Sequence, residues 1–158
     1  MSTCTFLGHR QCPPDLRPQL RRVLMDFIEE HGVRTFYVGN QGGFERMACS
    51  VLRELCLEYP SVTYGVVLAH LPINGQEKRE NAMDDSHLIL PDGIDTIPKQ
   101  FAMDWRNRWM LKQSDYVVTY VTHPCGHAAR YAALAKQMGK RVLNLDPPRS
   151  VSPYIGRV

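Results

Sequence analysis

Three short segments of the sequence combine glycine with polar or cationic side chains. They are Gly8-His9-Arg10, Gly39-Asn40-Gln41-Gly42-Gly43-Phe44-Glu45 and Thr122-His123-Pro124-Cys125-Gly126-His127. Glycine lets the backbone approach a ligand closely, and the free N–H groups and dipole of a helix N-terminus favour an anion. Arg10 adds a guanidinium that can hold a phosphate with two parallel hydrogen bonds. Together the segments predict a site for a phosphate-bearing, nucleotide-like ligand.

The same segments also allow simpler interpretations. Neither a Walker motif nor a complete G-x-G-x-x-G is present, so the Gly42-Gly43 pair also fits an ordinary tight turn. His123, Cys125 and His127 are metal-ligand types, but no second cluster has the spacing of a zinc site, and we expect no metal and no other cofactor. Cys125 lies near an expected helix N-terminus, which stabilises a thiolate, yet no base–nucleophile pattern accompanies it.

A parallel sheet would bring the three segments together. Short β-rich runs alternate with longer helical stretches, which predicts the α/β class, with a mainly parallel sheet of five or more strands between two helical layers. Strands are expected near 3–7, 35–38, 62–69, 115–121 and 141–145, and helices near 15–31, 44–59, 99–112 and 127–138. With the strand order 3-2-1-4-5, the order reverses between the first and fourth strands. The segments would then meet at the carboxyl edge of the sheet.

Length and composition limit the class of protein. A chain of 158 residues, 44% hydrophobic and 22% charged, predicts one globular domain over 1–158 and excludes collagen-like, coiled-coil and disordered proteins. No apolar run approaches the ~18 residues that span a bilayer, so we expect no membrane partner. The N-terminal residues lack a secretory signature, which predicts the cytoplasm, and the five cysteines are expected to be reduced thiols. A net charge of +3 argues against nucleic acid as a partner.

Other features have structural interpretations. The polar stretch 70–98, with one short apolar run at Leu88-Ile89-Leu90, is expected to be a functional lid or partly disordered. Phe101, Trp105 and Trp109 recur at helical spacing and are expected in the core. Arg108 is expected to form a surface salt bridge. A solvated helix face is predicted for the three arginines that lie off the apolar side of helix 15–31, namely Arg17, Arg21 and Arg22.

The order and spacing of four motifs resemble the SLOG superfamily and, within it, the YpsA-like branch. The motifs are Phe6-Leu7-Gly8-His9-Arg10, the 39–45 segment, Arg106-Asn107 before Ser114-Asp115, and the Gly126 loop, and the resemblance extends from Thr3 to Leu145. Relatives include the lonely-guy phosphoribohydrolases and the DNA-processing protein DprA. The resemblance implies a Rossmann-like fold that binds nucleotides or nucleotide-derived ligands at this edge. It also leaves a homodimer or higher homo-oligomer open, with the Trp105/Trp109 helix as a candidate surface.

The lonely-guy enzymes use an arginine and a glutamate, and only the arginine has a clear counterpart. Met103-Asp104-Trp105-Arg106-Asn107 matches their Met-x-x-Arg-Lys pattern, with Asn107 in the lysine position. Their Pro-Gly-Gly-x-Gly-Thr-x-x-Glu loop reads Pro124-Cys125-Gly126-His127-Ala128-Ala129-Arg130 here, so that Arg130, or Ala132 in a shifted register, replaces the glutamate. Glu45 is the loop carboxylate that could substitute for it. A carboxylate at a helix N-terminus is also favourable without catalysis.

Three hypotheses of function follow. The first is a sensor or degenerate enzyme that binds a nucleotide-like ligand, with Arg106 also near the phosphate or sugar. The second is a nucleoside 5′-monophosphate phosphoribohydrolase with Arg106 and Glu45 as catalytic groups. The third is DprA-like single-stranded DNA binding through the helix with Arg17, Arg21 and Arg22. The residues expected to contact the small ligand of the first hypothesis are Gly8, His9, Arg10, Gly39, Asn40, Gly42, Gly43, Thr122, Gly126 and His127.

Overall fold

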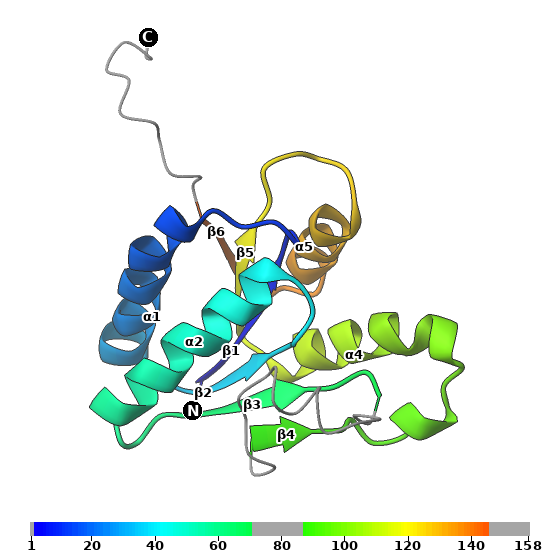
Figure 1. Ribbon diagram of the computed structural model, residues 1–158, viewed down its shortest axis with the longest axis horizontal. Helices are drawn as coiled ribbons and strands as arrows, with labels where there is room; N and C mark the ends of the chain where they lie inside the picture. Colours follow the sequence, from blue (N-terminus) through cyan, green and yellow to red (C-terminus); the bar gives the residue numbers. More distant parts are fainter. Residues whose placement is uncertain (1, 71–86, 146–158) are drawn as a thin grey trace, which may run out of the picture.

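The structure, a computed structural model, describes residues 2–70 and 87–145 (Figure 1). Within them, strands and helices alternate along the chain. The strands are β1 (Ser2–Gly8), β2 (Val33–Val38), β3 (Thr63–Val67), β4 (Leu88–Ile89), β5 (Tyr116–Tyr120) and β6 (Arg141–Asn144). The helices are α1 (Arg17–His31), α2 (Gly43–Glu58), α4 (Lys99–Gln113) and α5 (His127–Gln137), with short 3-10 turns η1 (Pro14–Leu16) and η3 (Ile94–Thr96) before α1 and α4. The elements lie close to their predicted positions.

The strands form one parallel sheet with the order β4-β3-β2-β1-β5-β6. This confirms the predicted α/β class and the predicted order of the five longer strands. The short Leu88–Ile89 run adds a sixth strand at the edge beside β3. The order reverses between β1 and β5, which pair in register with Phe6 opposite Val118. The carboxyl edge where the sequence places the three loops therefore lies at the ends of β1 and β5.

Helices cover both faces of the sheet. Neighbouring residues of β1 point to opposite faces, so each packs against a different helical layer. Phe6 packs in the core beneath α1 and α2, whereas Leu7 packs with Met110 of α4 and Tyr131 of α5. Figure 1 shows α1 and α2 together on one side of the strands and α4 and α5 on the other. The loops at the carboxyl edge thus connect strands to helices of different layers.

The prediction that the α4 aromatic residues lie in the core is wrong for two of the three. Phe101 is 56% exposed and Trp105 is 41% exposed, while Trp109 is half-buried and makes a T-shaped contact with Tyr37, at 5.3 Å between ring centroids. The buried face of α4 carries instead Ala102, Arg106, Asn107, Met110 and Leu111. The spacing of the apolar residues indicated the wrong face of α4, because an arginine and an asparagine occupy part of its buried face.

The structure does not test two expectations from the sequence, the role of the 70–98 stretch and the number of domains. Most of the 70–98 stretch, residues 71–86, lies outside the described residues, and the described part contributes His70, β4 and η3. A single domain over 1–158 stays a prediction. Among the helices that the structure describes, none combines the length and apolar character needed to cross a bilayer.

Candidate functional site

The loop after β1 contacts both other glycine-containing segments. The Gly43 N–H donates to the Arg10 carbonyl oxygen at 2.6 Å, and the Thr122 N–H donates to His9 Nε2 at 2.9 Å. Gly8 packs closely on the first turn of α2, because a Cβ there would lie 2.4 Å from the Phe44 ring. The structure therefore places Gly8, His9 and Arg10 between the segments that start α2 and α5.

Both α2 and α5 begin at a glycine with the same unusual backbone conformation. Gly42 has φ 92° and ψ 169°, and Gly126 has φ 94° and ψ 178°. Residues with an L side chain are strained in this conformation. Because the N-cap residue of each helix is a glycine, it has no side chain that could bond to the first N–H groups. The two helices thus direct backbone N–H groups toward the carboxyl edge in matching ways.

The two helix N-termini differ in access. At α2, the Arg10 carbonyl covers Gly43 so closely that a Cβ would lie 2.6 Å from its oxygen. At α5, Gly126 and His127 are exposed and border a shallow pocket of about 460 Å³. The pocket is lined by Pro124, Gly126, His127, Ala129, Arg130 and Ala133. The N-terminus of α5 is therefore more open than that of α2.

Exposed cations surround these loops. Arg10 lies against the Gly42 turn, where a Cβ on Gly42 would be 3.2 Å from Arg10 Cγ, and Arg46 is exposed in the first turn of α2. On α5, Arg130 Nη2 lies 3.3 Å from His127 Nδ1. Sequence reasoning did not include Arg46 and Arg130 among the ligand residues, although both stand one turn into the helices that follow the glycines. Position in the first turn was the signal that could have found them.

His9 organises the edge as a neutral ring. Its imidazole stacks on His123 with 4.3 Å between centroids and meets Tyr120 edge-on. Partial burial, together with the His123 charge, lowers the pKa of His9. Because Nε2 accepts the Thr122 N–H, the proton of the neutral ring is on Nδ1. His9 thereby fixes the first residue of the 122–127 loop.

Glu45 and Arg106 meet at the end of β2 although they come from opposite helical layers. Glu45 Oε2 of α2 lies 3.4 Å from Arg106 Nη1 of α4, and the side chains are only 7% and 2% exposed. Glu45 Oε1 accepts the Gln41 N–H at 3.1 Å, and Arg106 Nη1 donates to the Val67 carbonyl at 3.2 Å. Gly39 leaves room for the pair, since a Cβ there would lie 1.8 Å from Glu45 Oε2.

Burial dominates the electrostatics of this ion pair. It raises the pKa of Glu45, while the neighbouring Arg106 charge and the Gln41 N–H act in the opposite direction. Arg106 Nε and the adjacent Asn107 Oδ1 are buried, and neither has a hydrogen-bond partner among the residues that the structure describes. The two proposed catalytic residues are thus adjacent, and their side chains are enclosed by protein.

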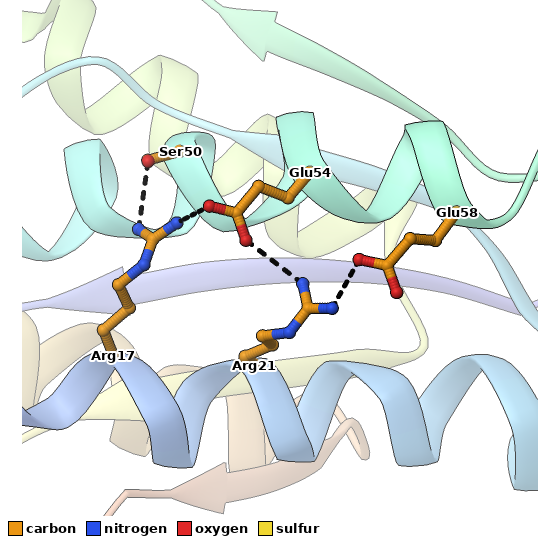
Figure 2. A network of polar contacts seen from close by, with 5 residues as sticks. All are labelled: Arg17, Arg21, Ser50, Glu54 and Glu58. Carbon is orange, nitrogen blue, oxygen red and sulfur yellow. Dashed lines mark hydrogen bonds and ion pairs between the residues drawn. The ribbon is translucent and has the colours of Figure 1, made fainter.

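The arginines of α1 are engaged in a network with α2 (Figure 2). Arg17 bonds to Ser50 and Glu54, and Arg21 bonds to Glu54 and Glu58. Arg22, by contrast, is exposed. Two of the three cations that the third hypothesis assigned to DNA are therefore already paired with carboxylates. On α4, Arg108 pairs with Asp104 at 2.9 Å, which confirms the predicted surface salt bridge.

The remaining predicted residues lie in the same loops. Asn40 is half-buried beside Gln41, and Thr122 is exposed at the start of the 122–127 loop. In the part of the chain that the structure describes, no three His, Cys, Asp or Glu side chains are grouped closely enough to hold a metal ion. The edge offers backbone N–H groups, guanidinium groups and imidazoles, which are donors suited to a phosphate.

These features define a Rossmann-like α/β protein with a loop-built edge where the strand order reverses. Two solved structures share the fold: DNA processing protein A from Helicobacter pylori, with a TM-score of 0.63 and 14% identity, and DprA from Streptococcus pneumoniae, with 0.67 and 15%. Each match covers 96% of this chain, but the chain spans only 67% of the first protein and 52% of the second. The likeness supports the predicted Rossmann-like fold. Comparison with protein-family models finds no match, and neither does comparison with curated proteins.

The comparison contradicts the expectation that nucleic acid is not a partner. The Helicobacter pylori protein that shares this fold binds single-stranded DNA. The expectation was drawn from a net charge of +3. Net charge is a poor guide here because phosphates are bound by local groups of cations, and a chain with many surface carboxylates elsewhere can still present such a group.

Proposed function

We propose that this chain binds a nucleotide or nucleotide-derived ligand at the carboxyl edge of its sheet, as a sensor or a degenerate enzyme. The observation that carries the proposal is the exposed Gly126 turn at the start of α5, where His127 and Arg130 border the same pocket. A phosphate there would accept hydrogen bonds from backbone N–H groups and from a guanidinium. Arg10 and Arg46 would face further negative charge near the Gly42 turn. We further propose that the protein is cytoplasmic and belongs to the YpsA-like branch.

Single-stranded DNA is the second candidate ligand, for the same edge. It is favoured by the fold shared with DprA and by the exposed cations around the loops. The face of α1 is less suited, because Glu54 and Glu58 already neutralise Arg17 and Arg21. The phosphodiesters of a strand and the phosphomonoester of a mononucleotide both carry anionic oxygens that could accept hydrogen bonds at the Gly126 turn.

Cleavage of the N-glycosidic bond is a third candidate, favoured by the contact between Glu45 and Arg106. A glutamate with a raised pKa suits general acid catalysis. The enclosed side chains would have to become accessible before a sugar could reach them. Release of free base from nucleoside monophosphates, lost in Glu45→Gln, would support this activity, and no release from any of them would exclude it.

Calorimetric titration with nucleoside monophosphates, the matching nucleosides and a single-stranded oligonucleotide tests the proposal. We expect the monophosphates to bind and the nucleosides to bind much more weakly. Arg130→Met should weaken binding about 10- to 100-fold, because charged hydrogen bonds contribute about 1.5–3 kcal/mol. Arg22→Met removes an exposed cation of α1 and should leave the affinity for the monophosphates unchanged.

The glycine provides a second, matched pair of variants. Gly126→Ala should impair binding, because the strained turn must change its conformation. Gly139 also has a positive φ, but it lies at the other end of α5. The Cβ of Gly139→Ala would meet no described atom within 4 Å. Equal affinities for the two variants would contradict the proposed site. Binding of the oligonucleotide alone would favour the second candidate.

A further inference from the structure

A pair of histidine rings connects the loop after β1 to the Gly126 turn. The His9 and His123 rings are stacked, with 4.3 Å between their centroids and 11° between their planes. His123 Cε1 in turn lies near the turn, since a Cβ on Gly126 would be 3.9 Å from it. His9 Nε2 also accepts the Thr122 N–H at 2.9 Å. The two rings therefore contact both ends of the segment 122–126, which leads into α5.

Few other contacts hold the backbone of this segment. Just before it, Asn144 of β6 accepts the Val121 N–H at 2.9 Å and donates to the Val121 carbonyl oxygen at 3.1 Å. Among the described residues, the next hydrogen bond to a backbone group after Thr122 runs from the Arg130 N–H to the Gly126 carbonyl oxygen, at 3.1 Å. Of these contacts, only the one with the imidazole involves a group that titrates near neutral pH.

The contact between His9 and Thr122 requires an unprotonated Nε2. An imidazolium carries N–H donors on both ring nitrogens, so protonated His9 would set one donor against the Thr122 N–H. It would also bring a positive charge to the face of the stacked His123 ring. Uptake of a proton by His9 is therefore incompatible with both contacts that connect it to the segment.

The groups around His9 favour its neutral form. Tyr120 of β5 meets the ring edge-on with 5.7 Å between centroids, and Arg10 is its neighbour in the chain. None of the described carboxylates forms an ion pair with His9, and Glu45 in the first turn of α2 is paired with an arginine of α4. Partial burial lowers the pKa of His9 below its ordinary 6.5, and the His123 charge acts in the same direction.

We propose that neutral His9 is a positioning residue of the phosphate site, because it holds the 122–127 loop in the conformation that exposes the Gly126 turn. The inference rests on the proposed function for the ligand, but the loop contact can be tested without one. His9 acts through Thr122 and His123, so the contact is present at pH values above 6.5 and is lost as the pH falls through the lower folded value. Acid should then weaken phosphate binding, whereas an imidazolium that touched the phosphate would strengthen it.

NMR of the ligand-free protein against pH tests the loop contact. The Thr122 and Gly126 amide signals should move with the same midpoint as the His9 ring, below pH 6.5. His9→Gln supplies an acceptor that does not titrate, so this step should be absent. His9→Phe keeps a ring but has no acceptor, so the acid-form signals should appear at every pH. His31→Gln, at the end of α1, should leave the step unchanged. A Thr122 signal that does not follow His9 would overturn the inference.

Calorimetric titration with adenosine 5′-monophosphate at pH 8 and pH 5 tests the effect on the site. The phosphate itself gains a proton near pH 6, so the wild type is compared with His9→Gln at each pH. The two should bind alike at pH 8. At pH 5 the wild type should bind about 3- to 10-fold more weakly, as expected for the loss of one hydrogen bond.

Two other results separate the possible failures. Equal or tighter binding by the wild type than by His9→Gln at pH 5 would overturn the positioning role, and tighter binding would show that the imidazolium contacts the phosphate. Absence of binding at both pH values would instead contradict the proposed function. The ligand-free titration would then decide by itself whether His9 holds the loop.

Discussion

Glu45 Oε2 lies 3.4 Å from Arg106 Nη1, and this buried ion pair joins the two helical layers around the end of β2. It also connects to the Gly42 turn, because Glu45 accepts the N–H of Gln41. Gly39 permits the contact by leaving no side chain between the layers. The glycines of the 39–43 segment thus have different roles: Gly39 accommodates the ion pair, whereas Gly42 sets the turn that starts α2.

Removing the arginine should destabilise the fold strongly. Arg106→Met leaves the Glu45 carboxylate buried without its cation, which typically costs 3–5 kcal/mol. Urea unfolding measures the loss. Arg108→Met, which removes an exposed arginine two residues away, should cost less than about 1 kcal/mol. Similar losses for the two variants would contradict the structural importance of the buried pair.

A methyl group at position 39 should act through the same pair. Gly39→Ala places a Cβ 1.8 Å from Glu45 Oε2 and 1.9 Å from Arg106 Nη1, so one of them must move. Such overpacking costs about 1–3 kcal/mol. The loss should be smaller when Arg106→Ala has already opened space, and a double-mutant cycle by urea unfolding measures the difference. Strict additivity would contradict the proximity of these residues.

Glu45 should titrate above the usual glutamate range. Burial raises its pKa from an ordinary 4.5, so the folded protein holds this proton more tightly than the unfolded chain does. The contribution of Glu45 to stability is therefore fully present at pH values below 4.5 and is lost as the pH rises through the higher folded value. Carboxyl-carbon NMR against pH gives the folded pKa directly. A midpoint below the ordinary value would show that the Arg106 charge outweighs burial.

The α1–α2 network should contribute little and should depend on salt. Glu54, which pairs with Arg17 and Arg21, is 51% exposed. Glu54→Gln should cost about 1 kcal/mol or less in urea unfolding, and the cost should shrink in 1 M NaCl as the charges are screened. A salt-independent loss of several kcal/mol would contradict this. If nucleic acid binds, Arg21→Met should leave its affinity unchanged.

Local patterns predicted the sheet well but not which polar residues are buried. β-rich runs such as 3–7 and 115–121 were sufficient to place the central strands, because a buried parallel strand requires a nearly continuous apolar sequence. The burial of Arg106 was not predictable, since an arginine is buried only when a partner from elsewhere in the chain compensates its charge. Because Arg106 lies on the buried face of α4, the apolar pattern also failed to predict that Trp105 is exposed.

The arrangement of the loops at the candidate site was predicted in part. The glycines marked loops that the structure does bring together, because parallel strands place their carboxyl ends at one edge. The sequence could not show that the Arg10 carbonyl covers the α2 turn while the α5 turn stays open. That difference arises from contacts between segments more than 30 residues apart.

Backbone amide NMR with added adenosine 5′-monophosphate tests the central claim most directly. If the phosphate binds at the exposed turn, the N–H signals of His127, Ala128 and Ala129 should shift most, and adenosine without phosphate should not reproduce the change. Signals that stay unchanged in these residues, while others respond to saturating nucleotide, would contradict a phosphate site at the start of α5.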